Sequence, residues 1–350
     1  MFAVNGYGME SADAPLAPIS FHRRDPRPHD IAIDILFCGI CHADVGLARG
    51  EWGFGSYPCV PGHEIIGTVT HVGDAVTRFK VGDRAGVGPL VDSCRTCGPC
   101  KEGFEQMCDP GFTPTYMGPD ADFGHTYGGY SGAIVVDENY AVSVPAALDP
   151  ARAAPLLCAG ITAWAPLKHA GVGPGMTVGV IGIGGVGHLA IKLAKALGAS
   201  TVALTTSPGK ADDARRLGAD DVLITSDADA MAASRERFDL ILDTVSMPHD
   251  LDAYMALVKR QGELVMLGTP DHIEAKPLSF VFRQKRMSGS FIGGIHEVQE
   301  LMEFCAENNI GADVELVAID QLNEAWARMI AADVHYRFVI DMATLPSPAA

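Results

Sequence analysis

The fold is decided by one stretch near the middle of the chain, Val178-Gly179-Val180-Ile181-Gly182-Ile183-Gly184-Gly185-Val186-Gly187. Its glycines follow the pattern G-x-G-x-x-G. A β-branched run, Thr177–Ile181, ends at this turn, and residues Gly185–Leu197 have the apolar spacing of a helix. A glycine turn between a strand and a helix is the arrangement that binds the pyrophosphate of a dinucleotide.

Each glycine of the pattern has its own role in such a turn. Gly182 permits the tight turn, Gly184 lets the backbone approach the pyrophosphate, and Gly187 lets the helix pack closely on the strand. The alternative is a glycine-rich turn without a ligand. The residues that follow favour the dinucleotide site, because they continue in the order that this site requires.

Beyond the turn, strands alternate with helices. We predict strands at Thr201–Leu204, Asp221–Ile224, Phe238–Leu242, Glu263–Leu267 and Met287–Phe291. The predicted helices between them are Lys210–Leu217 and Leu251–Lys259. This alternation predicts an α/β fold with a doubly wound parallel sheet and helices on both faces.

The end of the second strand indicates which nucleotide is bound. An NAD-binding protein carries Asp or Glu there, to accept the ribose hydroxyls. This chain has Thr205-Thr206-Ser207-Pro208-Gly209-Lys210 instead. Hydroxyls and one cation suit the 2′-phosphate of NADP(H), which a carboxylate would repel. The alternative for Lys210 is a solvated lysine in the first turn of a helix.

The flanking parts of the chain differ from this middle part. Up to about Pro145 the sequence predicts an irregular β-rich domain, with strands at Ile31–Phe37, Ile65–Val72 and Ala133–Val136. Near the C-terminus we predict a helix over Ile295–Asn308 and a last strand over Tyr336–Asp341.

Composition and charge exclude several classes of function. The 350 residues are 48% hydrophobic and 20% charged, so disorder is not the main character of the chain. A formal net charge of −17 repels a polyphosphate backbone, and we therefore expect no nucleic-acid partner.

Two segments bear on the location of the protein. Met1–Ala17 has no Lys or Arg and no unbroken apolar run, so it predicts neither a secretory signal nor a transit peptide. Gly171–Ile191 contains eight glycines, which exclude a membrane span. We expect a cytoplasmic protein with no membrane partner, in a compartment that keeps cysteines reduced.

Four of the nine cysteines lie within one short loop, Cys94-x2-Cys97-x2-Cys100-x7-Cys108. Four thiolates can close a tetrahedral shell around zinc, with no position left open for chemistry. The alternatives are a redox dithiol and an iron–sulfur cluster. No strand–helix redox context surrounds the loop, so we predict a structural zinc that pins a surface lobe.

A second group of metal-binding residue types is scattered along the chain. It comprises Cys41, His63 with Glu64, and Cys158. Spacing alone gives little support for a metal here, because buried cysteines are common core residues and Gly-His-Glu often forms a plain turn. A catalytic metal is one hypothesis for this group, and inert core residues are the other.

Several motifs together carry a resemblance to a known family. In order along the chain they are Cys41-His42-x-Asp44, Gly62-His63-Glu64, the four-cysteine loop, Leu157-Cys158-Ala159-Gly160-Ile161-Thr162, Gly182–Gly187 and Tyr336-Arg337-Phe338-Val339. This series is similar to that of the zinc-dependent medium-chain alcohol dehydrogenases, in the branch of the cinnamyl-alcohol-dehydrogenase-like aldehyde reductases. The match covers nearly the whole chain.

The resemblance implies a domain arrangement. Residues 1–150 with 293–350 would form a catalytic β-barrel domain that binds both zinc ions, and residues 151–292 the nucleotide-binding domain. The substrate would lie in the cleft between the two domains. Homodimers are usual in the family, so a homodimer is the expected assembly.

The resemblance also assigns roles to single residues. Cys41, His63 and Cys158 would hold a catalytic zinc, with Glu64 entering during ligand exchange and Asp44 orienting the imidazole of His63. Trp52 and Tyr57 resemble the aromatic wall of the substrate pocket. The implied cofactor contacts are Thr162, the turn Gly182, Ile183, Gly184, Gly185, Val186 and Gly187, and then Thr205, Thr206, Ser207, Lys210, Thr244, Gly268, Ser290, Phe291 and Ile292. Cys38, Cys59 and Cys305 are left as core or surface residues.

The chain departs from the family at the proton relay. Relatives carry Ser or Thr two residues after the first zinc cysteine and often His five residues after it, where this chain has Ala43 and Gly46. Neither residue can transfer a proton. The expected function is reduction of aldehydes to primary alcohols with NADPH and two zinc ions per chain. The alternatives are reduction of an imine or an activated C=C bond, and a nucleotide-binding sensor with an inactive site.

Overall fold

The computed structural model describes residues 1–53 and 55–346. The chain divides into two compact units. Unit 1 comprises Met1–Cys158 and Gly293–Ala350, and unit 2 comprises Ala159–Ile292. The first boundary therefore falls eight residues later than the one that the sequence suggests.

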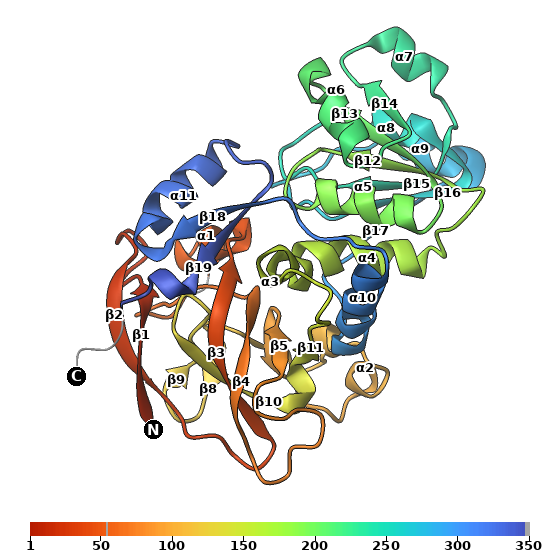
Figure 1. The fold of residues 1–350 in the computed structure, drawn as a ribbon. Coiled ribbons are helices and arrows are strands. Elements are labelled where there is room, and N and C mark those ends of the chain that lie inside the picture. Colours follow the sequence, from red (N-terminus) through yellow and green to blue (C-terminus); the bar gives the residue numbers. More distant parts are fainter. Residues whose placement is uncertain (54, 347–350) are drawn as a thin grey trace. The chain divides into compact units, whose positions relative to one another are not determined.

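Unit 2 is built on a six-stranded parallel sheet (Figure 1). Its strand order is β14-β13-β12-β15-β16-β17. The bounds are β12 Thr177–Ile181, β13 Ser200–Thr205, β14 Asp221–Ile224, β15 Phe238–Asp243, β16 Val258–Met266 and β17 Arg286–Gly289. Numbered from β12, this is the order 3-2-1-4-5-6 of a doubly wound dinucleotide-binding sheet. The predicted fold class is confirmed.

The first helix of unit 2 precedes β12, and the others lie between successive strands. They are α4 Ala159–His169, α5 Gly187–Ala196, α6 Ala211–Arg216, α7 Ala228–Ala233, α8 Leu251–Leu257 and α9 Leu278–Val281. Strands β12, β13 and β15 are buried along almost their whole length, as expected for a sheet that is covered on both faces. The predicted helix over Leu251–Lys259 was wrong at its end, because Val258 already pairs with Phe238 in the sheet.

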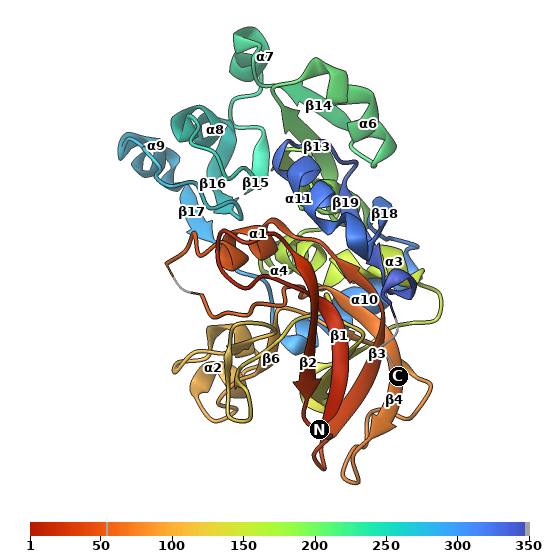
Figure 2. The same cartoon turned by 90° about the vertical axis from the view of Figure 1, so that its left-hand side faces the viewer.

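Unit 1 contains a seven-stranded sheet in which β3 is the central strand (Figure 2). Strand β3 pairs with β4, β10 and β19. The strands of this sheet are β3 Asp30–Gly39, β4 Ile65–Val72, β5 Arg84–Val87, β10 Ala133–Asp137, β11 Val142–Ser143, β18 Val314–Ala318 and β19 Arg337–Asp341. Strand β3 is buried at most positions, so its apolar side chains lie in the core of the unit.

Three two-stranded pairs and five helices complete unit 1. The pairs are β1 Phe2–Gly8 with β2 Ala17–Arg23, β6 Leu90–Asp92 with β7 Thr113–Pro114, and β8 Pro119–Asp120 with β9 Gly124–His125. The helices are α1 His42–Ala48, α2 Gly98–Lys101, α3 Pro150–Ala153, α10 Ile295–Glu307 and α11 Leu322–Ile330. The C-terminal strand β19 returns to pair with β3, where Ile340 lies opposite Cys38.

No helix in the described part of the chain has both the length and the apolar character that crossing a membrane requires.

Candidate active site

Unit 1 brings together the four scattered residues that the sequence singled out. Cys41 caps the N-terminus of α1, and His63 and Glu64 directly precede β4. Cys158 follows a short 3-10 turn over Ala154–Leu157. One ligand atom from each of the four residues lies within 4.8 Å of every other.

The donor set fits a zinc ion. Two thiolates bound to one tetrahedral zinc lie about 3.8 Å apart, and a thiolate and an imidazole nitrogen about 3.6 Å apart. In the structure the sulfurs of Cys41 and Cys158 are 4.0 Å apart, and Nε2 of His63 is 3.3 Å from the sulfur of Cys158. Two sulfurs and one nitrogen leave one position of a tetrahedral shell for a further ligand.

Asp44 lies behind this group and is completely buried. Its Oδ1 accepts from Nδ1 of His63 at 2.9 Å and from the backbone N–H of Gly62 at 3.1 Å. Its Oδ2 accepts from the backbone N–H of Cys41 at 2.9 Å. Because Nδ1 of His63 faces a carboxylate, the proton of the neutral ring stays on Nδ1 and Nε2 keeps its lone pair.

Glu64 is held by a buried ion pair. Its Oε1 accepts from Nη2 of Arg337 on β19, and both side chains are almost completely buried. The other oxygen, Oε2, has no hydrogen-bond partner among residues 1–53 and 55–346. Burial raises the pKa of Glu64 to about 7, although the Arg337 guanidinium opposes this shift. A buried carboxylate oxygen without a partner next to a Cys2His set is a second observation that fits a cation.

Helix α1 also contacts the two aromatic residues that were predicted to line the substrate pocket. A side chain on Gly46 would meet the ring of Trp52 at 3.4 Å. The hydroxyl of Tyr57 donates to the carbonyl of Ala48 at 2.8 Å. Trp52 remains 50% exposed. The Trp52 ring therefore packs beside α1 at Gly46.

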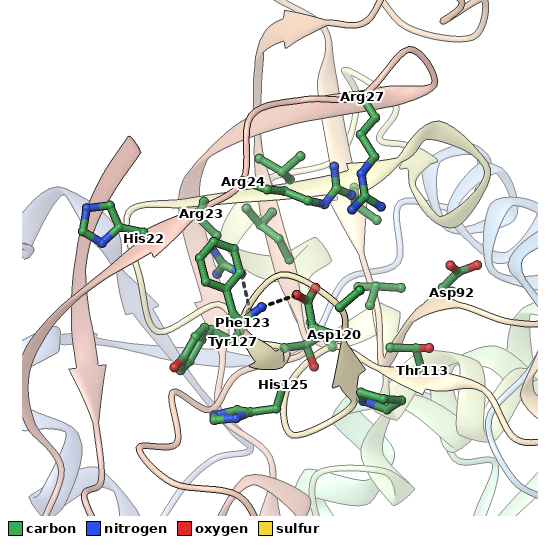
Figure 3. Close-up of a pocket in the computed structure, with 18 residues that line it drawn as sticks. His22, Arg23, Arg24, Arg27, Asp92, Thr113, Asp120, Phe123, His125 and Tyr127 are labelled. Atoms are coloured by element: carbon green, nitrogen blue, oxygen red, sulfur yellow. Dashed lines mark hydrogen bonds between the residues drawn. The ribbon is translucent and has the colours of Figure 1, made fainter. Parts of the chain in front are cut away.

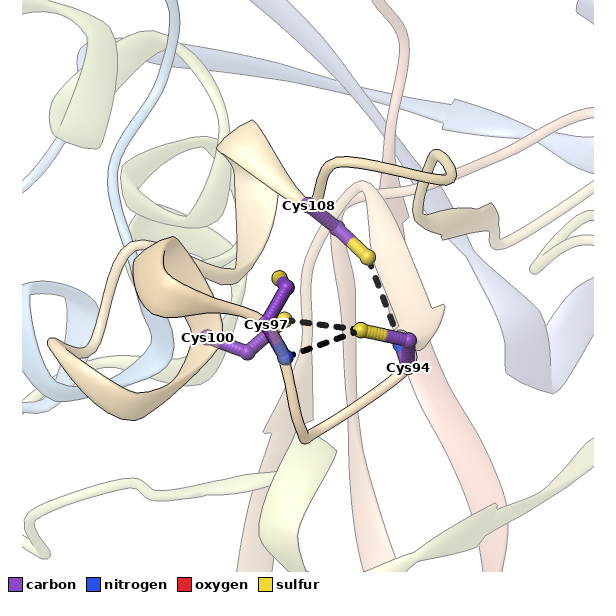
Figure 4. A group of neighbouring side chains, drawn as sticks. All are labelled: Cys94, Cys97, Cys100 and Cys108. Carbon is purple, nitrogen blue, oxygen red and sulfur yellow. Dashed lines mark hydrogen bonds between the residues drawn. The ribbon is translucent and has the colours of Figure 1, made fainter.

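The four-cysteine loop forms a second compact group of sulfurs, which Figure 4 shows converging from both ends of the loop. Its ligand atoms also lie within 4.8 Å of one another, and the sulfurs of Cys94 and Cys100 are 3.9 Å apart. Backbone N–H groups of Thr96 and Cys97 lower the pKa of the Cys94 thiol to about 6. The backbone N–H of Cys94 in turn donates to the sulfur of Cys108 at 3.3 Å. Thiolates in this setting fit one tetrahedral zinc.

The remaining cysteines have no part in either group. Cys38, Cys59 and Cys305 are fully buried, and none of the nine cysteines, all of which lie in the described residues, forms a disulfide. Burial raises the pKa of Cys38 and of Cys59, which keeps both as unreactive thiols. These three residues belong to the core.

Unit 2 contains the glycine turn at the C-terminal end of β12. Gly182 has a φ of +87°, which side chains rarely tolerate. A Cβ on Gly187 would lie 2.0 Å from the carbonyl oxygen of Gly182, so only glycine permits this approach. A Cβ on Gly184 would meet nothing within 4 Å, so the backbone there is open to a ligand. Ile183, Gly185 and Val186 complete the turn before α5 begins.

The end of β13 lies next to this turn. Nζ of Lys210 is 3.5 Å from the carbonyl oxygen of Ile183, which brings the ammonium group to the glycine turn. Thr206 and Ser207 are exposed between them, and Thr205 is buried with its hydroxyl accepting from the N–H of Ser207 at 3.2 Å. No Asp or Glu occupies the stretch 205–210.

The other predicted cofactor residues also lie in unit 2. The hydroxyl of Thr244 donates to the carbonyl of Ile181 at the end of β12, and a Cβ on Gly268 would lie 2.2 Å from the carbonyl oxygen of Val245. Ser290, Phe291 and Ile292 follow β17, and Thr162 is on α4. Thr244 and Gly268 thus follow the C-terminal ends of β15 and β16, the edge at which doubly wound sheets bind ligands.

Sequence reasoning missed three residues that support the metal group. Arg337 pairs with Glu64, while Tyr130 and Trp326 form a hydrogen-bond chain that reaches Asp44. Of the three, only Arg337 could have been suspected from the sequence. An arginine next to the apolar run Phe338-Val339-Ile340 must find a buried partner.

Comparison with known families covers both units. The model of the alcohol dehydrogenase GroES-like domain matches residues 27–146, and that of the zinc-binding dehydrogenase domain matches residues 185–307. NADP-dependent alcohol dehydrogenase C 1 of Mycolicibacterium smegmatis is 50% identical over 99% of this chain and 100% of its own length. Aldehyde reductase YahK of Escherichia coli is 49% identical over 98% of this chain and 99% of its own.

Solved structures give the same result. A cinnamyl alcohol dehydrogenase of Sorghum bicolor superimposes with a TM-score of 0.95 at 42% identity, over the full length of both chains. CAD of Helicobacter pylori, solved in complex with NADP(H), has a TM-score of 0.92 at 37% identity and covers 98% of this chain and 99% of its own. The chain therefore belongs to the zinc-dependent medium-chain alcohol dehydrogenases, in the branch of the cinnamyl-alcohol-dehydrogenase-like aldehyde reductases.

Proposed function

We propose that this protein is an NADP(H)-dependent alcohol dehydrogenase that reduces aldehydes to primary alcohols. The observation that carries the proposal is the convergence of Cys41, His63 and Cys158, with the unpartnered Oε2 of Glu64 beside them. The names of full-length relatives, which include NADP-dependent alcohol dehydrogenases and an aldehyde reductase, support the same activity. They do not favour reduction of an imine or an activated C=C bond.

On the metal side, Cys41, His63 and Cys158 would hold one zinc. When bound, the zinc supplies a Lewis acid that draws electron density from a carbonyl oxygen. Asp44 keeps the proton of His63 on Nδ1, so that Nε2 is available as a ligand. Arg337 fixes one oxygen of Glu64 and leaves the other within reach of the ligand atoms, as a transient ligand during exchange requires.

On the nucleotide side, the turn from Gly182 to Gly187 would bind the pyrophosphate through backbone N–H groups. Thr206, Ser207 and Lys210 would contact the 2′-phosphate, where a carboxylate would repel it. The bound NADPH supplies the hydride. The absence of an acid after β13 supports NADP(H) over NAD(H).

The substrate would pack against Trp52 and Tyr57, which suits a planar or apolar aldehyde. Ala43 and Gly46 carry no group that can transfer a proton, so the product oxygen would take its proton from water. Ala43 is half-buried, so water can approach α1 at that position.

The four-cysteine loop would bind a second zinc with no open position, and thus hold the lobe between β6 and β7 without a part in the chemistry. The six cysteines of the two groups must stay reduced for both sites to fill. This requirement supports a cytoplasmic location.

We also propose a homodimer. Strand β17 pairs only with β16 among the described strands, so it presents an open sheet edge. Close by in sequence, Leu278, Val281 and Phe282 are 69–72% exposed. An unprotected edge with apolar neighbours suits pairing with a second copy. Sedimentation should give a dimer for the parent protein and a monomer for Phe282→Asp; a monomeric parent would refute the assembly.

A steady-state assay tests the activity. NADPH with cinnamaldehyde or benzaldehyde should be turned over, and turnover should be lost when zinc is removed and regained when it is returned. Binding of NADPH without turnover of any aldehyde would refute the proposal and favour a sensor. Turnover of cyclic imines with aldehydes inert would refute it in favour of imine reduction.

A further inference from the structure

The side chain of Tyr130 lies behind the metal group and is completely buried. It belongs to the segment between β9 and β10, far in sequence from every residue of that group. Its hydroxyl lies 3.0 Å from Oδ2 of Asp44, to which it donates. Nε1 of Trp326, on α11, lies 3.4 Å from the same hydroxyl oxygen.

These contacts fix the direction of the hydrogen bonds. An indole N–H can only donate, so the Tyr130 oxygen accepts from Trp326 and its own proton is directed at Asp44. Asp44 accepts this bond as well as the one from Nδ1 of His63. Trp326 therefore donates to Tyr130, and Tyr130 donates to Asp44, which also accepts from His63.

Tyr130 differs from the other donors to Asp44. The remaining three are the N–H groups of Cys41 and Gly62 and the ring of His63, all of which belong to the metal-binding segments themselves. Tyr116 is a second buried tyrosine that interacts with Asp44, but its hydroxyl donates to a backbone carbonyl of α1 at 3.3 Å. Tyr130 is the tyrosine whose hydroxyl donates to Oδ2 of Asp44, at 3.0 Å.

The segment that carries Tyr130 is anchored by Arg23. This arginine is 8% exposed, and its guanidinium donates to the carbonyls of Tyr127, Gly128 and Ala133 and to the hydroxyl of Ser131. It borders a cavity of about 280 Å³, which Figure 3 shows with Arg23 and Tyr127. Four bonds from one buried guanidinium fix both flanks of Tyr130, so the position of the Tyr130 ring is tightly determined.

We propose that Tyr130 is a positioning residue of the metal centre, whose hydroxyl holds Asp44 and through it the ring of His63. The inference rests on the proposed function, since it requires a metal at Cys41, His63 and Cys158. Trp326 orients the Tyr130 hydroxyl, and Arg23 holds the segment that presents it.

The test compares two substitutions that each remove one buried tyrosine hydroxyl from unit 1. Tyr130→Phe removes the donor to Asp44. Tyr140→Phe is the matched control, because its hydroxyl lies 2.7 Å from Ser93, whose own hydroxyl contacts Cys100 of the four-cysteine loop. Zinc per chain and the zinc dissociation constant of each site would be measured by chelator competition, together with the melting temperature of the zinc-loaded proteins.

Tyr130→Phe should weaken zinc binding at the Cys41–His63–Cys158 site by about tenfold, the lower end of the range for outer partners of metal ligands. The second zinc should be unaffected and thereby report that the unit is folded. Replacement of the zinc by cobalt(II) adds a spectroscopic signature, since a shifted His63 ring alters the absorption bands of the metal. Tyr140→Phe should leave that affinity and those bands unchanged.

Each outcome bears on one proposal. An unchanged zinc affinity and cobalt spectrum in folded Tyr130→Phe, with two zinc ions in the parent protein, would overturn the positioning role alone. Equal weakening in Tyr130→Phe and Tyr140→Phe would also overturn it, because the effect would then be general. A parent protein that binds zinc only in the four-cysteine loop would overturn the proposed function itself.

Discussion

The two sulfur-rich groups of unit 1 are built in opposite ways. The four-cysteine loop takes all its ligand atoms from residues 94–108, and its own backbone N–H groups support the sulfurs. The other group joins Cys41 to Cys158, which are 117 residues apart, and buries a carboxylate oxygen that has no partner. One group is complete within a short loop, whereas the other depends on the fold of the whole unit.

Because of this difference, we expect the four-cysteine loop to contribute to the stability of the protein and the other group to catalysis. A local loop with four thiolates has every coordination position filled, so a metal there can only hold the chain. A group with two sulfurs and one nitrogen has an open position, and it is surrounded by partners that orient its ligands, such as Asp44 and Arg337. Substitutions in the two groups should therefore affect different measurements.

The largest effect is expected for Cys158→Ser. A Lewis acid contributes several kcal/mol to the stabilisation of developing charge, so kcat/KM for aldehyde reduction should fall by about a thousandfold. The zinc content should fall from two ions to one. Activity within tenfold of the parent protein would show that the Cys41–His63–Cys158 group is not the reaction centre.

Cys100→Ser should act on stability instead. Loss of the metal from the loop belongs to the strongly destabilising class of changes, and we expect about 3 kcal/mol or more and a melting temperature lower by roughly 5–10 °C. At a temperature where the variant is folded, kcat should stay within about threefold of the parent value. A thousandfold loss of kcat with an unchanged melting temperature would reverse the assignment of the two groups.

The same contrast explains what the sequence could and could not reveal. The spacing of Cys94, Cys97, Cys100 and Cys108 predicts a common metal because the ligands are local. The spacing of Cys41, His63 and Cys158 leaves a common metal as one hypothesis of two, and only the resemblance to a family assigns them as its ligands. Tyr130 left no signal at all, because an aromatic residue in a glycine-rich segment does not indicate the carboxylate that it contacts.

The secondary structure likewise contains elements that the sequence predicts and elements that it does not. Strands β4, β12 and β14 were predicted with the bounds that the structure has, because β-branched or apolar residues predominate in each. Helix α4 was not predicted, since Gly160 and Pro166 interrupt its helical pattern and burial on nearly all sides stabilises it instead. Strand β18 was also missed, and it is defined by pairing with β19 rather than by its own partly exposed residues.

Lys210→Glu should lower kcat/KM with NADPH by an intermediate factor, and it should affect only the nucleotide site of unit 2. Replacing the cation by an anion removes a charge-assisted contact worth about 1.5–3 kcal/mol, so kcat/KM with NADPH should fall by about 10- to 100-fold. The value with NADH should hold or rise. Both zinc ions should remain, which separates this site from the two sulfur-rich groups. A parent protein that prefers NADH would refute the assignment.

The smallest effect is expected for Ala43→Ser, at the second position of α1. A serine restores a hydroxyl two residues after Cys41, on a helix turn whose carbonyl at residue 43 already accepts from Tyr116 at 3.3 Å. If water alone carries the proton in the parent protein, the added hydroxyl should raise the rate of alcohol oxidation near pH 7 by a few-fold. The gain is small because a proton-transfer group contributes about 100-fold or more only when it is optimally placed. An unchanged rate and pH profile in Ala43→Ser would show that the missing relay does not limit the reaction.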